Sequence, residues 1–213
     1  MSKNYTDTRT PLSDKELEKY SSWMREIFHR LGMEKDTEST IDTPHRYVEA
    51  LQEMTAGYEP DPKIQTAFPA ECRECADHEL EHIVNGPVKF TALCEHHVLP
   101  FYGSIWIGVV RSTRHGEVLG LSKYTRIVRQ YTRRFTLQER IAQEIAAHVM
   151  KSVTPVGVAV AIVSDHSCIS SRGVLETNTH TNTFLWRGIY DSREEGSPYR
   201  QEFLSMLKLK ANG

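Results

Sequence analysis

Two short motifs rich in cysteine and histidine, far apart in the chain, constrain this fold more than any other feature. One is Cys94-Glu95-His96-His97 and the other is His166-Ser167-Cys168. Zinc readily binds cysteine sulfur and histidine nitrogen, and a catalytic zinc site keeps three protein ligands and an open position for water. Cys94, His97 and Cys168 supply such a set, which requires a fold that brings the two motifs together.

Each motif alone is a weak signal, because free cysteines are often ordinary core residues and histidines are often surface residues. The second histidine beside Cys94, and the His-x-Cys directly after an apolar strand, both favour metal binding. The residues alone leave open whether His96 or His97 binds the metal. Neighbours in a strand face opposite sides, so only one of the two is expected to point to it.

Composition limits the classes of protein that fit. The chain has 213 residues, enough for one domain with an appendage. Its 26 basic and 28 acidic residues leave a net charge of −2, which argues against a general nucleic-acid binder. No apolar run approaches the roughly 20 residues of a membrane helix, and the first residues lack the apolar middle of a secretory signal. Four cysteines without export features predict a reducing, cytoplasmic setting.

The hydrophobic pattern predicts two N-terminal helices, then strands on either side of a helical pair, then a last helix. Serine or threonine caps are expected for four of the helices, at Ser13, Thr43, Ser122 and Thr136. Residues 58–82 are expected to form a loop. The expected strands are 88–93, 102–110, 157–163 and 177–186, and the last helix is 199–209. This order predicts an α+β fold, a sheet with helices on one face.

Several motifs together resemble the GTP cyclohydrolase I family over nearly the whole chain after the first helix. They are Thr43-Pro44-His45-Arg46, Cys94-Glu95-His96-His97, Gly120-Leu121-Ser122-Lys123 with Arg126-Ile127-Val128, Gln138-Glu139-Arg140, His166-Ser167-Cys168, Arg172-Gly173-Val174 and Glu202-Phe203-Leu204. The resemblance implies a tunnelling fold, an antiparallel sheet with a helical pair on one face. Residues 1–60 would form an N-terminal helical extension and residues 61–213 the catalytic domain with its C-terminal helix. It also implies a homodecamer of two stacked pentamers.

The implied reaction is the zinc-dependent opening of the guanine ring of GTP at C8, with release of formate and closure to 7,8-dihydroneopterin triphosphate. By resemblance Cys94, His97 and Cys168 hold Zn²⁺, which lowers the pKa of bound water to about 7. His96 and His166 move protons, and protonation of N7 makes C8 more electrophilic. The remaining implied residues are Ser122 for the sugar rearrangement, Gln138 and Glu139 for guanine, and Lys123, Arg126, Arg172 and Arg46, the last from a neighbouring subunit, for the triphosphate.

Several of these residues also have a plain structural interpretation. Thr136 and Glu139 have the spacing of a capping box, which needs no ligand. Ser122 is equally explained as a helix cap. Lys123, Arg126 and Arg172 are by default solvated surface charges, although a triphosphate needs such groups.

Two other functions are compatible with the motifs. One is a catalytically inactive, zinc-binding paralogue that acts as an assembly or regulatory subunit; retention of both histidines, the three ligands and Glu139 argues against it. The other is a related tunnelling-fold enzyme that reduces a nitrile with NADPH, which needs a nucleophilic cysteine in place of the Cys-Glu-His-His motif. The sequence leaves the downstream pathway open between folate, biopterin and 7-deazapurine synthesis.

The family pattern does not explain Cys72, Cys75, His78 and His82. Their spacing could form a closed four-ligand zinc site, and a C-x-x-C pair could also be a redox dithiol. Prolines and charges surround the segment, so we expect it to have no special role.

Overall fold

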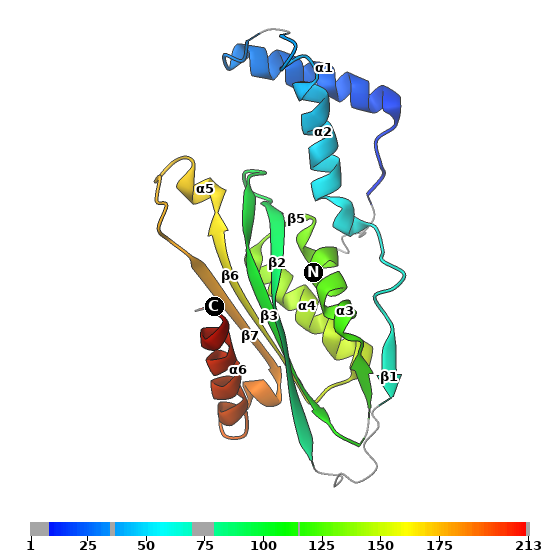
Figure 1. Cartoon of the computed structure of the whole chain (residues 1–213), viewed down its shortest axis with the longest axis vertical. Coiled ribbons are helices and arrows are strands. Elements are labelled where there is room, and N and C mark those ends of the chain that lie inside the picture. The colour runs from blue at the N-terminus through cyan, green and yellow to red at the C-terminus, as the bar shows by residue number, and fades with distance from the viewer. Residues whose placement is uncertain (1–8, 35–36, 70–78, 115, 212–213) are drawn as a thin grey trace, which may run out of the picture.

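The core of the protein is a five-stranded sheet with the strand order β5-β2-β3-β6-β7 (Figure 1). The computed structural model describes residues 9–34, 37–69, 79–114 and 116–211. The strands are β2 (Leu80–Cys94), β3 (Pro100–Ser112), β5 (Phe135–Thr136), β6 (Gly157–His166) and β7 (Thr181–Gly188). All neighbours are antiparallel except β2 and the short β5, which are parallel.

Helices α3 (Leu121–Thr132) and α4 (Gln138–Val153) cover one face of this sheet (Figure 1). Apolar residues recur on α4 at helical spacing, and Ile141, Ile145 and Val149 are fully buried against the strands. Burying one side chain of this size contributes roughly 1.5–3 kcal/mol. The apolar side chains whose spacing predicts these helices from the sequence are therefore the ones that hold them on the sheet.

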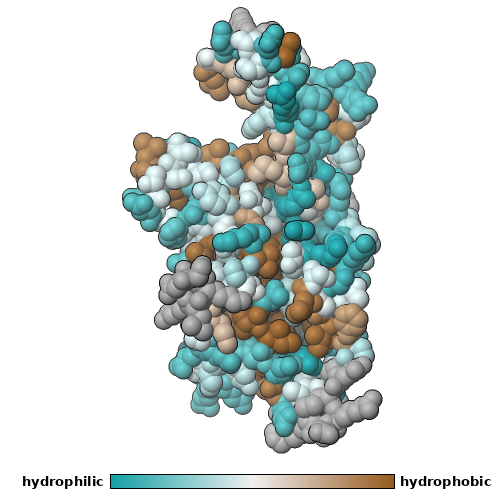
Figure 2. All heavy atoms as spheres, viewed as in Figure 1, coloured by the Kyte–Doolittle hydropathy of each residue, from teal (hydrophilic) through white to brown (hydrophobic). Residues whose placement is uncertain are grey.

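The opposite face carries the C-terminal helix α6 (Gly196–Ala211), which follows β7 and the short helix η2 (Ile189–Asp191). Trp106, Tyr190 and Phe203 form a second, smaller core there. Gly108 is needed beneath it, because an added Cβ would lie 2.6 Å from the Tyr190 hydroxyl. Figure 2 shows apolar side chains gathered on this side, in the lower half of the molecule. The middle of β3 and most of β6 are buried between α3 and α4 on one side and this second core on the other, which explains the almost continuous apolar run of β6.

The N-terminal helices α1 (Asp14–Arg30) and α2 (Thr43–Met54) project beyond one end of the sheet (Figure 1). A short helix, η1 (Ala56–Tyr58), links them to the body, where Gly57 N donates to Arg133 O at 2.8 Å. Ser13 caps α1 as predicted, in a capping box with Glu16. No described helix is both apolar enough and long enough to cross a bilayer.

The α+β class and the helical pair on one face are confirmed, but several predicted details are wrong. The strand expected at 88–93 begins at Leu80, inside the expected loop, and its exposed charges concealed it. The short strands β1 (Ala67–Pro69) and β4 (Glu117–Leu119) pair with each other and were not predicted. The last strand is Thr181–Gly188 and the last helix is Gly196–Ala211.

Three of the four predicted helix caps are also wrong. The N-cap residues are Asp42 for α2, Gly120 for α3 and Leu137 for α4. Thr136 instead lies in β5, opposite Cys94. Its pairing with β2 delays the start of α4 by one residue, which a local sequence pattern does not contain.

Candidate metal centre and active site

The sheet register brings the two predicted motifs together. Cys94 ends β2, and a tight turn leads to β3, with Val98 N donating to Cys94 O at 2.8 Å. Phe101, near the start of β3, is the register partner of His166 at the end of β6. Helix α5 (Ser167–Ser170) follows directly and carries Cys168 to the same end of the sheet.

Cys94, His97 and Cys168 form a cluster that could hold a metal ion, and their ligand atoms all lie within 4.8 Å of one another. Two thiols and one imidazole are a donor set that suits zinc, and a catalytic site of this kind has three protein ligands. His97 belongs to the cluster and His96 does not, although the His96 Nδ1 lies 3.9 Å from Cys94 Sγ. The structure therefore favours His97 over its neighbour as the ligand.

The two thiols influence each other. The pKa of the Cys168 thiol is raised, first by burial and then by the neighbouring Cys94. A divalent cation between them would oppose both effects, because it stabilises thiolates. Both cysteines are free thiols, as metal ligation requires.

His166 lies beside this cluster and is held on two sides. Its ring stacks on Phe101, with centroids 4.5 Å apart and planes inclined by 6°. Its Nε2 lies 2.9 Å from the Oε1 of Gln138. Burial lowers the pKa of His166, and the negative charges of Glu139 and Asp165 oppose that change. Neither Phe101 nor its stacking was predicted, although its position at the start of an apolar strand could have suggested a wall of the site.

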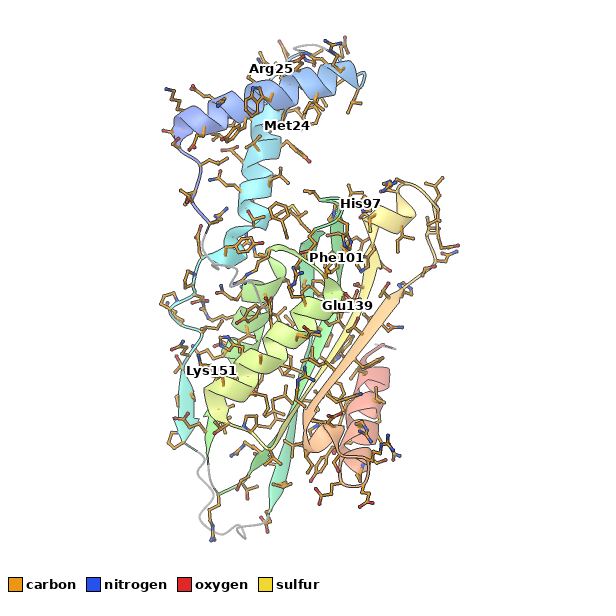
Figure 3. All side chains as sticks on the ribbon, turned by 180° about the vertical axis from the view of Figure 1, so that it is seen from behind. Met24, Arg25, His97, Phe101, Glu139 and Lys151 are labelled. Carbon is orange, nitrogen blue, oxygen red and sulfur yellow. The ribbon has the colours of Figure 1, made fainter. Side chains whose placement is uncertain are left out.

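Glu139 lies in the first turn of α4 at the same end of the sheet as His97 and Phe101 (Figure 3). The predicted capping box is absent from α4, since Leu137 is the N-cap and the Thr136 hydroxyl donates to Leu137 O at 3.4 Å. Glu139 is exposed, and its carboxylate is not used to cap the helix. The capping-box interpretation of Glu139 is therefore wrong.

The candidates for the triphosphate and the sugar are spread over three segments. Ser122 and Lys123 lie in the first turn of α3, where backbone N–H groups favour anions. Arg126, one turn on, pairs with Asp61 at 2.7 Å and lowers the pKa of that carboxyl. Arg172 is exposed just after α5.

Arg46 lies apart on α2, where it pairs with Asp42 at 3.2 Å. Among the described residues, no hydrogen bond or ion pair joins these five candidates to the metal cluster.

One pair of residues in the site was not predicted at all. Arg140, next to Glu139, makes a two-point ion pair with Glu95 in the turn between the two metal-ligand positions of the first motif. Both residues belong to motifs quoted above, and their opposite charges were the available signal. The pair joins the turn between Cys94 and His97, called the metal turn below, to the N-terminal end of α4.

The unexplained cysteine-histidine segment is only partly visible. Cys72, Cys75 and His78 lie outside the described residues. His82 is described, and both its ring nitrogens are engaged, Nδ1 with Glu202 at 2.8 Å and Nε2 with the Tyr190 hydroxyl at 2.5 Å. These contacts hold β2 to α6 and to η2, and they leave the His82 ring no nitrogen for a metal.

Comparison with known proteins gives a consistent result. The sequence model of the family described as GTP cyclohydrolase I matches residues 20–208. GTP cyclohydrolase 1 of Rickettsia prowazekii is 35% identical over 186 residues, 86% of this chain and 92% of that protein. The Saccharomyces cerevisiae protein of the same name is 33% identical over 194 residues, 90% of this chain and 74% of that protein.

A solved structure of an archaeosine synthase QueF-like protein is a much weaker match. It aligns with a TM-score of 0.37 at 16% identity, over 51% of this chain and 93% of that one. A likeness at that level carries no weight for the fold or the function.

Proposed function

The chain belongs to the GTP cyclohydrolase I family, and on that premise we propose that it hydrolyses GTP at C8 of the guanine ring. The reaction releases formate and closes the product to 7,8-dihydroneopterin triphosphate. Zn²⁺ is the proposed cofactor, and the proposed setting is a reducing cytoplasm in which Cys94 and Cys168 stay thiols.

The observation that supports this function best is the convergence of the Cys94, His97 and Cys168 cluster with His166 at one end of the sheet. When bound, zinc supplies Lewis acidity that makes water a usable nucleophile near neutral pH. The three side chains fit the ion because their donor atoms are close enough to share it and are of the types it prefers.

The other side chains would handle protons and the purine. C8 of a purine is a poor electrophile until N7 is protonated, and His166 and His96 are proposed to give and take protons there. The carboxylate of Glu139 can accept both the N1–H and the 2-amino group of guanine, a pair of donors that adenine lacks. Its freedom from a capping role supports this assignment.

The triphosphate needs several cations. Lys123, Arg126 and Arg172 are proposed for this purpose, and Arg46 is proposed to reach the site of a neighbouring subunit. Binding through Arg126 would have to displace or share its ion pair with Asp61. Ser122, exposed in the first turn of α3, is proposed to assist the sugar rearrangement.

The proposed assembly is the homodecamer of the tunnelling fold. The edge strand β7 supports it, since within the described chain this strand pairs only with β6 and leaves its other edge for a second copy. Helix α1 supports it as well, because Trp23 and Ile27 remain 55% and 46% exposed on an amphipathic helix that stands away from the body.

The test is incubation with GTP, with formate and zinc measured on the same sample and neopterin fluorescence read after oxidation. Formate release in proportion to bound zinc is the expected result. Zinc-loaded protein that binds GTP but releases no formate would instead identify the alternative, an inactive paralogue with an assembly or regulatory role.

A further inference from the structure

We propose that Gln138 is a positioning residue that holds His166 in the tautomer with its proton on Nε2. The inference rests on the proton-transfer role proposed for His166. It gives Gln138 a task different from the guanine contact that the resemblance implies.

The orientation of the Gln138 amide is set by its surroundings. Its Nε2 lies 3.0 Å from Thr181 O and 3.4 Å from Ile162 O, and backbone carbonyls can only accept hydrogen bonds. The amide nitrogen must therefore face β6 and β7. The amide oxygen faces the other way, where the Ser164 hydroxyl donates to it at 2.6 Å.

This orientation determines where His166 carries its proton. The Gln138 Oε1 is an acceptor only, and it lies 2.9 Å from His166 Nε2. A hydrogen bond between them requires the proton on Nε2, so in the neutral ring the lone pair is on Nδ1. His166 Nδ1 makes no hydrogen bond with any residue in the described ranges. Nδ1 is thus the nitrogen left to exchange a proton with a substrate.

The ring is fixed in orientation as well as in tautomer. Phe101 stacks on its face while Gln138 binds its edge, and both are almost fully buried. Gln138 is the first residue of α4 and is anchored to two strands of the sheet. Its polar atoms are already engaged, so a contact with guanine would have to break one of these bonds. Its neighbour Glu139 is exposed and needs to break none.

Gln138→Met tests the proposal, because methionine keeps the length of the side chain and removes the amide. We expect kcat to fall by about 10- to 100-fold, with the KM for GTP and the preference for GTP over ITP within about twofold of wild type. In a His166→Ala background the same substitution should have no further effect, since Gln138 acts only through that ring. Zinc content and helix content measured on every variant identify misfolded protein.

Three outcomes would overturn the inference. A raised KM with unchanged kcat and weaker selectivity for GTP would make Gln138 a guanine contact. A full loss that persists in the His166→Ala background would make its role structural. A normal kcat in Gln138→Met would show that the contact has no effect. Ser164→Ala is the matched variant, since it removes a bond to the same oxygen but leaves the one to the imidazole, and a smaller loss is expected.

A spectroscopic measurement separates this inference from the function itself. The measurement is solid-state ¹⁵N NMR of histidine-labelled protein at about pH 8, where imidazole is ordinarily neutral. The His166 signal is assigned as the one that disappears in His166→Ala, and it should show the proton on Nε2. A signal from the Nδ1–H tautomer would overturn the proposal even in an active enzyme. Failure of the wild type to release formate would overturn the proposed function and leave the tautomer result standing.

Discussion

Arg140 and Glu95 join the two elements that build the site, through a two-point ion pair between the first turn of α4 and the metal turn. Glu95 lies between Cys94 and His97, so its position sets the path of the chain from one proposed metal ligand to the other. A guanidinium fork fits a carboxylate in two places at once and therefore fixes orientation as well as distance. The relationship makes the stability of the metal site depend on α4.

Arg140→Met should therefore weaken zinc binding without removing a ligand. Loss of groups that orient metal ligands typically costs about 10- to 100-fold in metal affinity, and we expect a loss in that range, measured by competition with a chelator. Arg133→Met is the control, because Arg133 is similarly exposed, at 39% against 42%, and pairs with Glu53 on α2. Equal zinc affinity in wild type and Arg140→Met would show that the turn holds its shape alone.

Cys94→Ser and Cys168→Ser should each remove most of the zinc and most of the activity while helix content stays near normal. Serine lacks the thiolate that makes these side chains zinc ligands, and the remaining two donors do not form a catalytic set. Elemental analysis and formate release on the same preparations give the measurement. Full activity in a metal-free preparation of either variant would contradict the assignment.

Stripping the zinc should also make the two thiols prone to oxidation, because their sulfur atoms belong to one cluster within 4.8 Å. Peptide mapping of chelated, air-exposed protein should find a Cys94–Cys168 disulfide.

The pH dependence of stability should depend on His148, on the outer side of α4. Burial, and then the charge of Lys151, lower the pKa of His148 below its ordinary 6.5, while its Nδ1 lies 2.9 Å from the Tyr131 hydroxyl. The unfolded chain then binds a proton at this position before the folded protein does. The contribution of His148 to the free energy of unfolding is therefore fully present above about pH 6.5, and it is lost as the pH falls toward the lower folded-state pKa.

His148→Gln should flatten this dependence. Denaturant unfolding at several pH values between about 5 and 8 measures the slope. Identical slopes in wild type and His148→Gln would contradict the prediction.

Local chemistry explains which features could be predicted from the sequence. Zinc prefers cysteine and histidine as ligands, so Cys94, His97 and Cys168 could be grouped before their positions were known. Their closeness in space is confirmed. The helical pair could be predicted because the apolar spacing of Ile141, Ile145 and Val149 does not depend on distant residues. The presence of a metal in the cluster stays a prediction.

Contacts between distant segments explain what could not be predicted. Thr136 has the sequence signature of a helix cap, but it lies in β5 and pairs with Cys94 of β2. This pairing depends on a strand that is distant in the sequence. The bond from Gln138 to His166 depends on the register of β6 and β7 beneath α4. No pattern along the chain contains that register, so the two residues could only be assigned separately.

His166→Ala should separate proton chemistry from metal binding. The ring lies beside the cluster but is not one of the three residues proposed to bind zinc, so zinc content and GTP binding should be retained. Turnover should fall by about 100-fold or more, the usual scale for a positioned acid or base. Formate release and equilibrium GTP binding measure the two effects. Normal turnover would show that another group moves the proton.

Glu139→Gln should weaken the selection of guanine. A carboxylate can accept from N1–H and the 2-amino group together, whereas the amide offers one acceptor and turns a donor toward a donor. Hydrogen bonds to charged groups contribute about 1.5–3 kcal/mol, so kcat/KM for GTP should fall by about 10- to 100-fold. The loss for ITP should be smaller, since its base lacks the 2-amino group.

The matched control is Glu144→Gln, the same change of charge further along α4, where the side chain lines a separate cavity with His148 and Lys151. It should leave the ratio of kcat/KM for GTP and ITP as in wild type. A general electrostatic effect of removing an acid from this helix would change the ratio of kcat/KM for GTP and ITP in both variants alike. Because α4 is capped at Leu137 without a side-chain bond, a loss of selectivity confined to Glu139→Gln cannot come from an unmade helix cap. Unchanged selectivity in Glu139→Gln would mean that guanine is recognised elsewhere.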